Sequence, residues 1–261
     1  MKTLVRQETD SGAPTSQVVY RTRLASCAAD LRAAQSLRFM VFNLELREGL
    51  AQSFARCADV DPFDEVCDHL LIEDEQTGEL VGTYRMQTGL RAASHHGYYS
   101  EREFDFTPYE GLRARMMELG RACIAQGHRN YVALCTLWRG IFAYAQAHRQ
   151  RYLIGCSSLT SQSASMAAAV YQKLTPYLVE PELRTQPHPR FVCLLPQDFA
   201  TETPKVPKLL SAYLALGAQI CAPPAIDREF KTIDFLTMLD LWPRSAQSAQ
   251  RLTRFGVIVG G

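Results

Sequence analysis

The spacing of apolar residues along the chain predicts alternating helices and strands. In residues 25–50, apolar side chains recur at every third or fourth position, as on one face of a helix. HLLIED (69–74) and LVGTYRMQ (80–87) have the composition of strands, and they flank EQTGE, whose Gly78 permits a tight turn. These two segments therefore predict a β-hairpin, and the first half of the sheet is expected to be antiparallel.

The second half continues this alternation. MMELGRACI (116–124) and YLIGCSSL (152–159) are apolar runs of strand length, and residues 131–150 between them have helical spacing. A strand, a helix and a strand in this order predict a βαβ unit with a parallel pair, and the whole order predicts an α+β fold. The other predicted elements are a first strand at 18–22, a polar loop at 91–97, a helical turn at 109–114, a helix at 163–174, a strand at 190–196, an amphipathic segment at 206–216 and a late strand at 233–241.

Two charges interrupt one of the most apolar segments. Glu118 and Arg121 lie within residues 116–124, where an unpaired charge would cost several kcal/mol on burial. Strand periodicity places the two on opposite faces, and a bulge at Gly120 would bring them closer. A carboxylate here can act as a general base, because amide formation needs a neutral amine. The alternative is a plain buried salt bridge.

Composition excludes several classes of protein. A net charge of +1 gives no overall attraction to nucleic acid, so no nucleic-acid partner is expected. The eight cysteines contain no CxxC pair, which favours free thiols in a reducing cytoplasm over metal sites or disulfides. No apolar run reaches the roughly 18 residues of a membrane span, and residues 1–17 lack the apolar core of a signal peptide. A cytoplasmic protein with a disordered N-terminal tail at 1–17 is expected.

The order of elements, with ELGR on the central strand, resembles the GNAT N-acetyltransferase superfamily. More narrowly, the chain resembles the branch that takes acyl groups from acyl carrier protein, which includes acyl-homoserine-lactone synthases and N-acyl amino acid synthases. The resemblance implies a mixed, mostly antiparallel sheet flanked by helices, whose central strands splay into a V that holds the thioester. The spaced residues that carry it are Arg38, Phe42, Asp61, Asp64, Arg85, Glu118 and Arg121.

Longer blocks resemble the ornithine N-acyltransferases of the hemolysin-like group. They are RFMVFNLEL, DPFDEVCDHLLI, LVGTYRM, ELGRACI and LGAQICAPPAIDREFKTIDFLTML, within residues 24–241. The resemblance implies transfer of a 3-hydroxyacyl chain from acyl carrier protein to the α-amine of ornithine, giving lyso-ornithine lipid. The 4′-phosphopantetheine of the carrier is the expected donor arm, with no permanently bound cofactor and no metal. The expected domain is GNAT-like at 18–243, with a family-specific extension at 201–243 and a C-terminal tail at 244–261.

The resemblance also implies roles for the charged residues. Glu118 is the expected catalytic residue. The others are expected to join the N-terminal helix to the sheet through an ion network that shapes the acceptor site. Simpler alternatives are a solvated helix face for Arg38 and a turn beside Pro62 for Asp61. The expected substrate-binding or scaffold residues are Arg38, Phe42, Asp61, Asp64, Arg85 and Arg121.

The segment after residues 116–124 departs from the pattern of CoA-dependent acetyltransferases. Those carry Q/R-x-x-G-x-G/A, whereas this chain reads RNYVAL, with Val132 in place of the first glycine. A β-branched side chain hinders the approach of a pyrophosphate to the backbone, so the departure favours a carrier-protein donor over acyl-CoA. Residues expected to bind the single phosphate of phosphopantetheine are His128, Arg129 and Asn130.

A basic stripe beside this segment would suit an acidic carrier protein. The alternative for each of its members is an ordinary solvated helix face. The arginines of the stripe are Arg139, Arg149 and Arg151.

Other readings of the sequence stay open. HLLIED contains the H-x-x-x-x-D motif of lysophospholipid acyltransferases, but a strand would turn Asp74 away from His69, and the partner phosphate motif is absent. Arg251 and Arg254 lie among apolar residues, which suits either peripheral contact with the inner face of the cytoplasmic membrane or a last strand. The functional alternatives are another N-acyl amino acid synthase, an acyl-homoserine-lactone-type synthase, or a non-catalytic acyl-binding, membrane-associated module.

Overall fold

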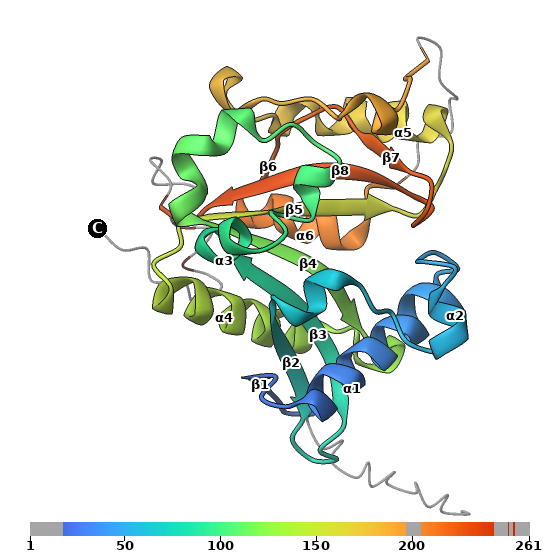
Figure 1. Cartoon of the computed structure of the whole chain (residues 1–261), viewed down its shortest axis with the longest axis vertical. Helices are drawn as coiled ribbons and strands as arrows, with labels where there is room; N and C mark the ends of the chain where they lie inside the picture. Colours follow the sequence, from blue (N-terminus) through green and yellow to red (C-terminus); the bar gives the residue numbers. More distant parts are fainter. Residues whose placement is uncertain (1–17, 197–204, 243–249, 251–252, 254–261) are drawn as a thin grey trace, which may run out of the picture.

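The computed structural model describes residues 18–196, 205–242, 250 and 253. Within these residues, eight strands form one sheet in the order β1-β2-β3-β4-β5-β8-β6, and β7 pairs with β8 (Figure 1). All pairings are antiparallel except that of β4 with β5. The strands are β1 Tyr20–Leu24, β2 Asp68–Asp74, β3 Leu80–Thr88, β4 Met116–Ile124, β5 Tyr152–Leu159, β6 Gln219–Ile220, β7 Ala225–Asp227 and β8 Thr232–Asp240.

Helices cover both faces of this sheet. Tyr84 and Met86 of β3 join the core under α4, and Arg85 between them points to the opposite face, where α1 contacts β3. Helix α1 continues into a π-helical segment, Met40–Glu45. In the described part of the chain, no helix has the length and apolar character needed to cross a membrane. The α-helices are α1 Ala28–Phe39, α2 Ser53–Arg56, α3 Gly89–Ser94, α4 Tyr131–Ala147, α5 Ala164–Leu174 and α6 Lys208–Leu216.

The predicted α+β fold is confirmed. The hairpin of β2 and β3 is present, and β4, α4 and β5 form the predicted βαβ unit with a parallel pair. The predicted tails at 1–17 and 244–261 lie outside the described residues, apart from positions 250 and 253. The predicted domain boundaries stay predictions.

Two local predictions are wrong. The loop expected at 91–97 overlaps α3, where the Thr88 hydroxyl accepts a hydrogen bond from the Arg91 backbone N–H and caps the helix. The strand expected at 190–196 is instead a 3₁₀ turn, Pro189–Phe191, followed by one bridge between Val192 and Ala225. Prolines at both ends of that segment lack the N–H donor that a longer ladder needs.

The parallel pair at the centre of the sheet separates soon after it begins. β4 and β5 pair only from Met116 with Tyr152 to Glu118 with Ile154, and beyond this point they diverge (Figure 1). Just after the last pair the backbones still touch, since a Cβ on Gly155 would lie 2.2 Å from the Leu119 carbonyl oxygen. Glycine is therefore required where the strands part. The predicted V-shaped splay is confirmed.

A β-bulge bends β4 inside the splay. The register with β3 runs from Thr83 opposite Cys123 to Arg85 opposite Gly120, so β4 holds one extra residue. The left-handed residue of the bulge is Arg121, with φ of 53°, rather than the glycine before it. The bulge predicted at Gly120 is thus present, but its strained position lies one residue further along the strand.

Candidate active site

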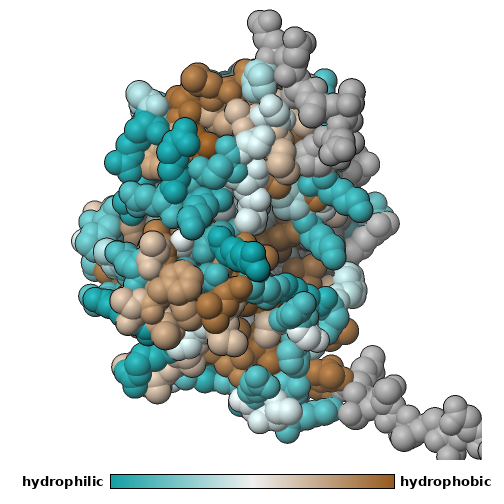
Figure 2. Space-filling view, turned by 90° about the vertical axis from the view of Figure 1, so that its right-hand side faces the viewer, coloured by the Kyte–Doolittle hydropathy of each residue, from teal (hydrophilic) through white to brown (hydrophobic). Residues whose placement is uncertain are grey.

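A cleft of about 710 Å³ lies between the diverging strands β4 and β5. Its lining includes the apolar side chains of Val41, Leu119 and Leu134, and also the charged residues Glu118 and Arg121. The strands diverge toward the right-hand side of Figure 1. Figure 2 shows that side of the molecule, where apolar surface lies among hydrophilic patches. The cleft thus has room and chemistry for a molecule with an apolar and a charged end.

Glu118 occupies the last paired position before the strands part. Its carboxylate accepts hydrogen bonds from the backbone N–H groups of Tyr99 and Ser100, both at 2.7 Å, and from the Ser100 hydroxyl at 2.6 Å. Burial raises the pKa of Glu118, and these three hydrogen bonds limit the rise without cancelling it. Among the described residues Glu118 forms no ion pair, so the structure does not contain the plain salt bridge that was the alternative to a functional role.

Six charged residues form a closed ring behind the cleft. Each arginine contacts two aspartates and each aspartate contacts two arginines, with N–O distances of 2.5 to 3.2 Å. The ring joins α1, the loop before β2, and strands β3 and β4, and all its side chains are nearly buried. Its three positive and three negative charges balance. In order around the ring, the residues are Arg38, Asp59, Arg121, Asp61, Arg85 and Asp64.

The ring brings together five predicted scaffold residues and one that sequence reasoning missed. Arg38 is 0% exposed, which contradicts a solvated helix face for this residue. Asp61 also caps the 3₁₀ turn Pro62–Glu65, so the turn reading and the network reading both hold. Asp59 was missed because a lone aspartate before DPFD looks like part of the turn. Burial alone would raise the pKa of Asp64, but Arg38 and Arg85 outweigh burial and hold that pKa below its usual range.

Arg121 connects the ring to the cleft. Its guanidinium lies 4.6 Å from the centre of the Phe230 ring, and Phe230 makes an edge-to-face contact with Phe42 at 5.7 Å. Phe42 and Arg121 both line the cleft. Phe42, the one predicted scaffold residue outside the ring, is therefore linked to Arg121 through Phe230.

The predicted phosphate-binding segment lies at one edge of the cleft. Arg129 and Asn130 line it, but Arg129 is paired with Glu45, and the Asn130 side chain caps α4 by accepting a hydrogen bond from the Ala133 N–H. His128 is directed to Tyr20, with 3.1 Å between its Nδ1 and the tyrosine hydroxyl. The structure thus brings two of these three residues to the cleft, and phosphate binding stays a prediction.

The arginines of the predicted basic stripe differ in their exposure and in their contacts. Arg139 and Arg149 are exposed, whereas Arg151 pairs with Asp240 of β8 at 2.7 Å. The H-x-x-x-x-D segment lies in strand β2, whose register with β3 shifts between Ile72 and Glu73. His69 contacts the backbone carbonyl of Asp64 there, and Asp74 accepts a hydrogen bond from the turn at Gln76. His69 and Asp74 are therefore tied to different neighbours.

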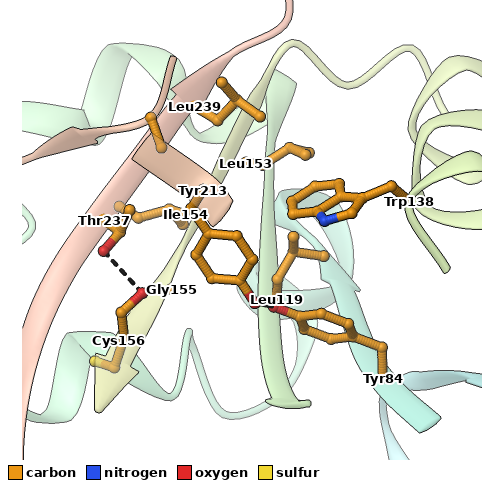
Figure 3. Close-up of a pocket in the computed structure, with 12 residues that line it drawn as sticks. Tyr84, Leu119, Trp138, Leu153, Ile154, Gly155, Cys156, Tyr213, Thr237 and Leu239 are labelled. Atoms are coloured by element: carbon orange, nitrogen blue, oxygen red, sulfur yellow. Dashed lines mark hydrogen bonds between the residues drawn. The ribbon is translucent and has the colours of Figure 1, made fainter. Parts of the chain in front are cut away.

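A small apolar cavity of about 30 Å³ adjoins the cleft, and Figure 3 shows the residues that line it. Trp138, Leu153 and Leu239 surround it, and Tyr84 and Tyr213 lie at its boundary with the cleft, because both line the two spaces. Their hydroxyl oxygens are 2.5 Å apart. This buried pair therefore stands between the cleft and the small cavity.

A second group of buried carboxyls was also missed. Glu103, Asp227 and Asp234 lie close together, and Glu48 nearby hydrogen-bonds the Thr160 hydroxyl at 2.5 Å. One signal was available in the sequence. Asp234 interrupts the apolar strand TIDFLTMLD as Glu118 interrupts MMELGRACI.

The open sheet splays at the parallel strands β4 and β5, beside a buried carboxylate, which is the arrangement of a GNAT-type domain. The family model described as "Acetyltransferase (GNAT) domain" matches residues 37–139, which contain the whole charged ring and Glu118. The chain is 34% identical to the L-ornithine N(alpha)-acyltransferase of Agrobacterium fabrum, over 90% of this chain and 84% of that protein. It is 32% identical to the protein of that name from Rhizobium meliloti, over 95% and 90%. The chain belongs to the L-ornithine N(alpha)-acyltransferase family.

Solved structures agree on the fold. A CoA-dependent acyl-homoserine lactone synthase, BjaI, has a TM-score of 0.53 at 12% identity, over 92% of this chain and 91% of that chain. At this identity the likeness shows the fold alone. The predicted GNAT resemblance and the acyltransferase class are confirmed, and the alternative of a non-catalytic acyl-binding module is wrong.

Proposed function

We propose that this acyltransferase moves a long-chain 3-hydroxyacyl group from acyl carrier protein to the α-amine of L-ornithine. The product would be lyso-ornithine lipid, which makes the reaction the first step of ornithine-lipid synthesis. The relatives at 34% and 32% identity are named for ornithine, which supports this acceptor. Apolar and charged side chains in one cleft suit a fatty donor and a charged acceptor.

One observation carries the proposal: Glu118 lies at the point where β4 and β5 stop pairing. A thioester lying between the strands would place its carbonyl near this point. The acyl chain would run along the apolar side chains of the cleft toward the cavity behind Tyr84 and Tyr213. The buried carboxylate would then face the amine that attacks the thioester.

The reaction follows from this placement. The neutral α-amine attacks the thioester carbonyl carbon, which forms the C–N bond and a tetrahedral intermediate. Glu118 accepts the proton that the amine loses, directly or through water. Collapse of the intermediate breaks the C–S bond, and the pantetheine sulfur leaves with that proton. A raised pKa suits this role, since a base is most effective when its pKa is near the working pH.

The donor proposal rests on the segment that begins α4, not on the fold, since the fold also serves a CoA-dependent synthase. Val132, 45% exposed, stands where the pyrophosphate loop of CoA-dependent acetyltransferases has a glycine. A single phosphate needs less backbone contact than a pyrophosphate. Arg129 and Asn130 at the cleft edge are proposed to contact it.

The test compares donors with the purified protein and L-ornithine. A 3-hydroxyacyl group of one chain length is supplied on acyl carrier protein or on CoA, and N-acylornithine is measured by mass spectrometry. We expect a much larger kcat/KM with the carrier protein. Equal values for the two donors would contradict the donor proposal, and absence of N-acylornithine with both would contradict the acceptor.

The Arg129→Ala variant tests the proposed contact with acyl carrier protein separately from the acyl-transfer step. We expect it to raise the KM for acyl carrier protein more than the KM for ornithine. Arg32→Ala, at an exposed arginine of α1, is the matched control. An equal effect of both variants would leave Arg129 without a specific role.

A further inference from the structure

Three buried carboxyl groups meet beside the cleft, apart from the charged ring. Glu103, Asp227 and Asp234 each offer one oxygen, and these oxygens lie within 4.8 Å of one another. Asp227 and Asp234 line the cleft, and all three residues are at most 7% exposed. Glu103 follows the 3₁₀ turn Ser100–Arg102, Asp227 ends β7 and Asp234 lies in β8. Three separate parts of the chain thus form this acidic cluster.

The acidic cluster has no counter-ion among the described residues. None of its carboxyls has an ion pair there, and Arg121, whose charge acts on Glu103, is already shared between two aspartates of the ring. Asp234 Oδ2 accepts a hydrogen bond from the Thr232 hydroxyl at 3.0 Å, but its buried Oδ1 accepts none. Asp227 accepts hydrogen bonds from the backbone N–H groups of Glu229 and Phe230, both at 2.8 Å, which also carry no full charge. Buried carboxylates without a counter-ion are costly. Asp234 lines the cleft and has a buried oxygen without a hydrogen bond, and a cationic ligand beside it would compensate this carboxylate.

The protonation of the cluster agrees with this reading. Burial, reinforced by Asp227, raises the pKa of Asp234 to about 6. Burial and the two neighbouring aspartates hold the pKa of Glu103 well above its usual range. Raised pKa values mean that these carboxyls hold a proton more readily than exposed ones, and a bound cation would lower the same pKa values.

We propose that the acidic cluster binds the side-chain ammonium of a dibasic amino acid. This inference rests on the proposed function and names the group of the acceptor that the enzyme recognises. An alkylammonium has three N–H donors, and the cluster offers three carboxyl groups. The cluster is also linked to the proposed base. The Ser100 hydroxyl binds Glu118 at 2.6 Å, and the Ser100 carbonyl accepts a hydrogen bond from the Glu103 N–H at 3.1 Å. The two amines of one acceptor would therefore be held at Glu118 and at the cluster.

A divalent metal suits the same oxygens less well. Mg²⁺ and Ca²⁺ prefer six or more oxygen ligands. Beside the cluster, the Cys156 sulfur lies 3.9 Å from Glu103 Oε2, and thiol sulfur is a poor ligand for either ion. The positive charge of Arg121 acts on the same carboxyl and would repel a divalent cation more than an ammonium.

The test compares L-ornithine with L-norvaline, which has the same carbon chain but no terminal amine. The wild-type enzyme should strongly prefer ornithine. We expect Asp234→Asn to raise the KM for ornithine roughly 10- to 100-fold, as for a lost charge-assisted hydrogen bond, and to leave norvaline within about threefold. Glu182→Gln, at an exposed glutamate, is the matched control. Glu103→Gln removes a second carboxyl in case the first variant does not fold, and Asp234→Glu should restore part of the preference.

Thermal unfolding provides a readout without turnover. We expect ornithine and 1,4-diaminobutane to raise the Tm of the wild-type protein but not that of Asp234→Asn, and MgCl₂ to have no such effect. Equal wild-type activity on ornithine and norvaline would overturn the inference, as would stronger stabilisation by Mg²⁺ than by the diamine. If the wild-type protein acylates no amino acid but the diamine effect depends on Asp234, the proposed function fails and the ammonium site stands.

Discussion

The guanidinium of Arg121 lies 4.8 Å from the centre of the Tyr99 ring, and the backbone of the same tyrosine holds Glu118. Tyr99 thus contacts both charged residues of β4, Glu118 and Arg121, yet these two residues do not form an ion pair with each other. Arg121 balances Asp59 and Asp61 in the ring, whereas Glu118 has uncharged donors only. This division leaves a carboxylate in the cleft that chemistry can use.

Replacing Glu118 with glutamine tests the proposed base. The side chain keeps its shape but cannot accept a proton, so we expect kcat to fall roughly 10²- to 10⁴-fold. The amide also places an NH₂ group against a backbone donor, which should cost about 1–3 kcal/mol of stability. Steady-state kinetics from pH 7 to 9, together with urea unfolding, measure the two effects. Activity near the wild-type level over this range would exclude Glu118 as the base.

Ser100→Ala is the matched control for that variant. It removes one hydrogen bond to the Glu118 carboxylate at 2.6 Å but keeps the carboxylate itself. We expect a loss of activity far smaller than that of Glu118→Gln. Equal losses would indicate that the carboxylate mainly orders the turn at Tyr99.

Asp59→Asn tests the charged ring. Removing one of three buried negative charges leaves Arg38 and Arg121 undercompensated, and breaking such a network costs about 3–5 kcal/mol. Glu110→Gln breaks a pair of Arg113 with an exposed glutamate, which should cost at most about 1 kcal/mol. Urea unfolding compares the two, and similar costs would mean that the ring does not stabilise the fold.

Tyr213→Ala tests the route of the acyl chain. Removing this ring joins the cleft to the cavity lined by Trp138 and Leu153, so the enzyme should accept longer acyl chains than the wild type. Tyr213→Phe loses the contact with the Tyr84 hydroxyl but keeps the volume, and its chain preference should not change. Competition among acyl donors of several lengths measures the preference. An unchanged profile for the alanine variant would place the chain elsewhere.

Asp234→Asn should change how stability depends on pH. Because the folded-state pKa of Asp234 is raised to about 6, its protonated form favours folding, and this contribution is lost as pH rises through that value. A rise from 3.8 to about 6 corresponds to on the order of 3 kcal/mol, shared with Glu103 because the two titrate together. The variant should therefore have a higher Tm than the wild type at pH 8 but not at pH 4. A constant difference in Tm would show that ionisation of this group is not the cause.

The elements that form the cleft could be predicted because their signals are local. Apolar runs of strand length identify β4 and β5, and Glu118 is conspicuous inside one of them. Helix α3 was missed because its short polar segment looks like a loop. Its Gly89 packs so tightly that a Cβ would lie 1.8 Å from the Arg113 carbonyl oxygen, a constraint set by a segment distant in sequence.

The composition of the site could be predicted only in part. The resemblance pointed to five ring residues, but closure of the ring depends on Asp59, whose partners are 21 and 62 residues away. The acidic cluster likewise joins residues from a turn and two strands, and no spacing in the sequence brings them together. Contacts of this kind follow from the register of the sheet rather than from any local pattern.

The closed ring has a consequence for how the chain reaches its native state. Each of its six charges has two partners, so a folding intermediate that lacks one member leaves two ions short of a partner in a region from which water is excluded. Folding intermediates with an incomplete ring are therefore less stable than both the unfolded chain and the native state. Helix α1, the loop before β2, and strands β3 and β4 are therefore expected to assemble in one cooperative step.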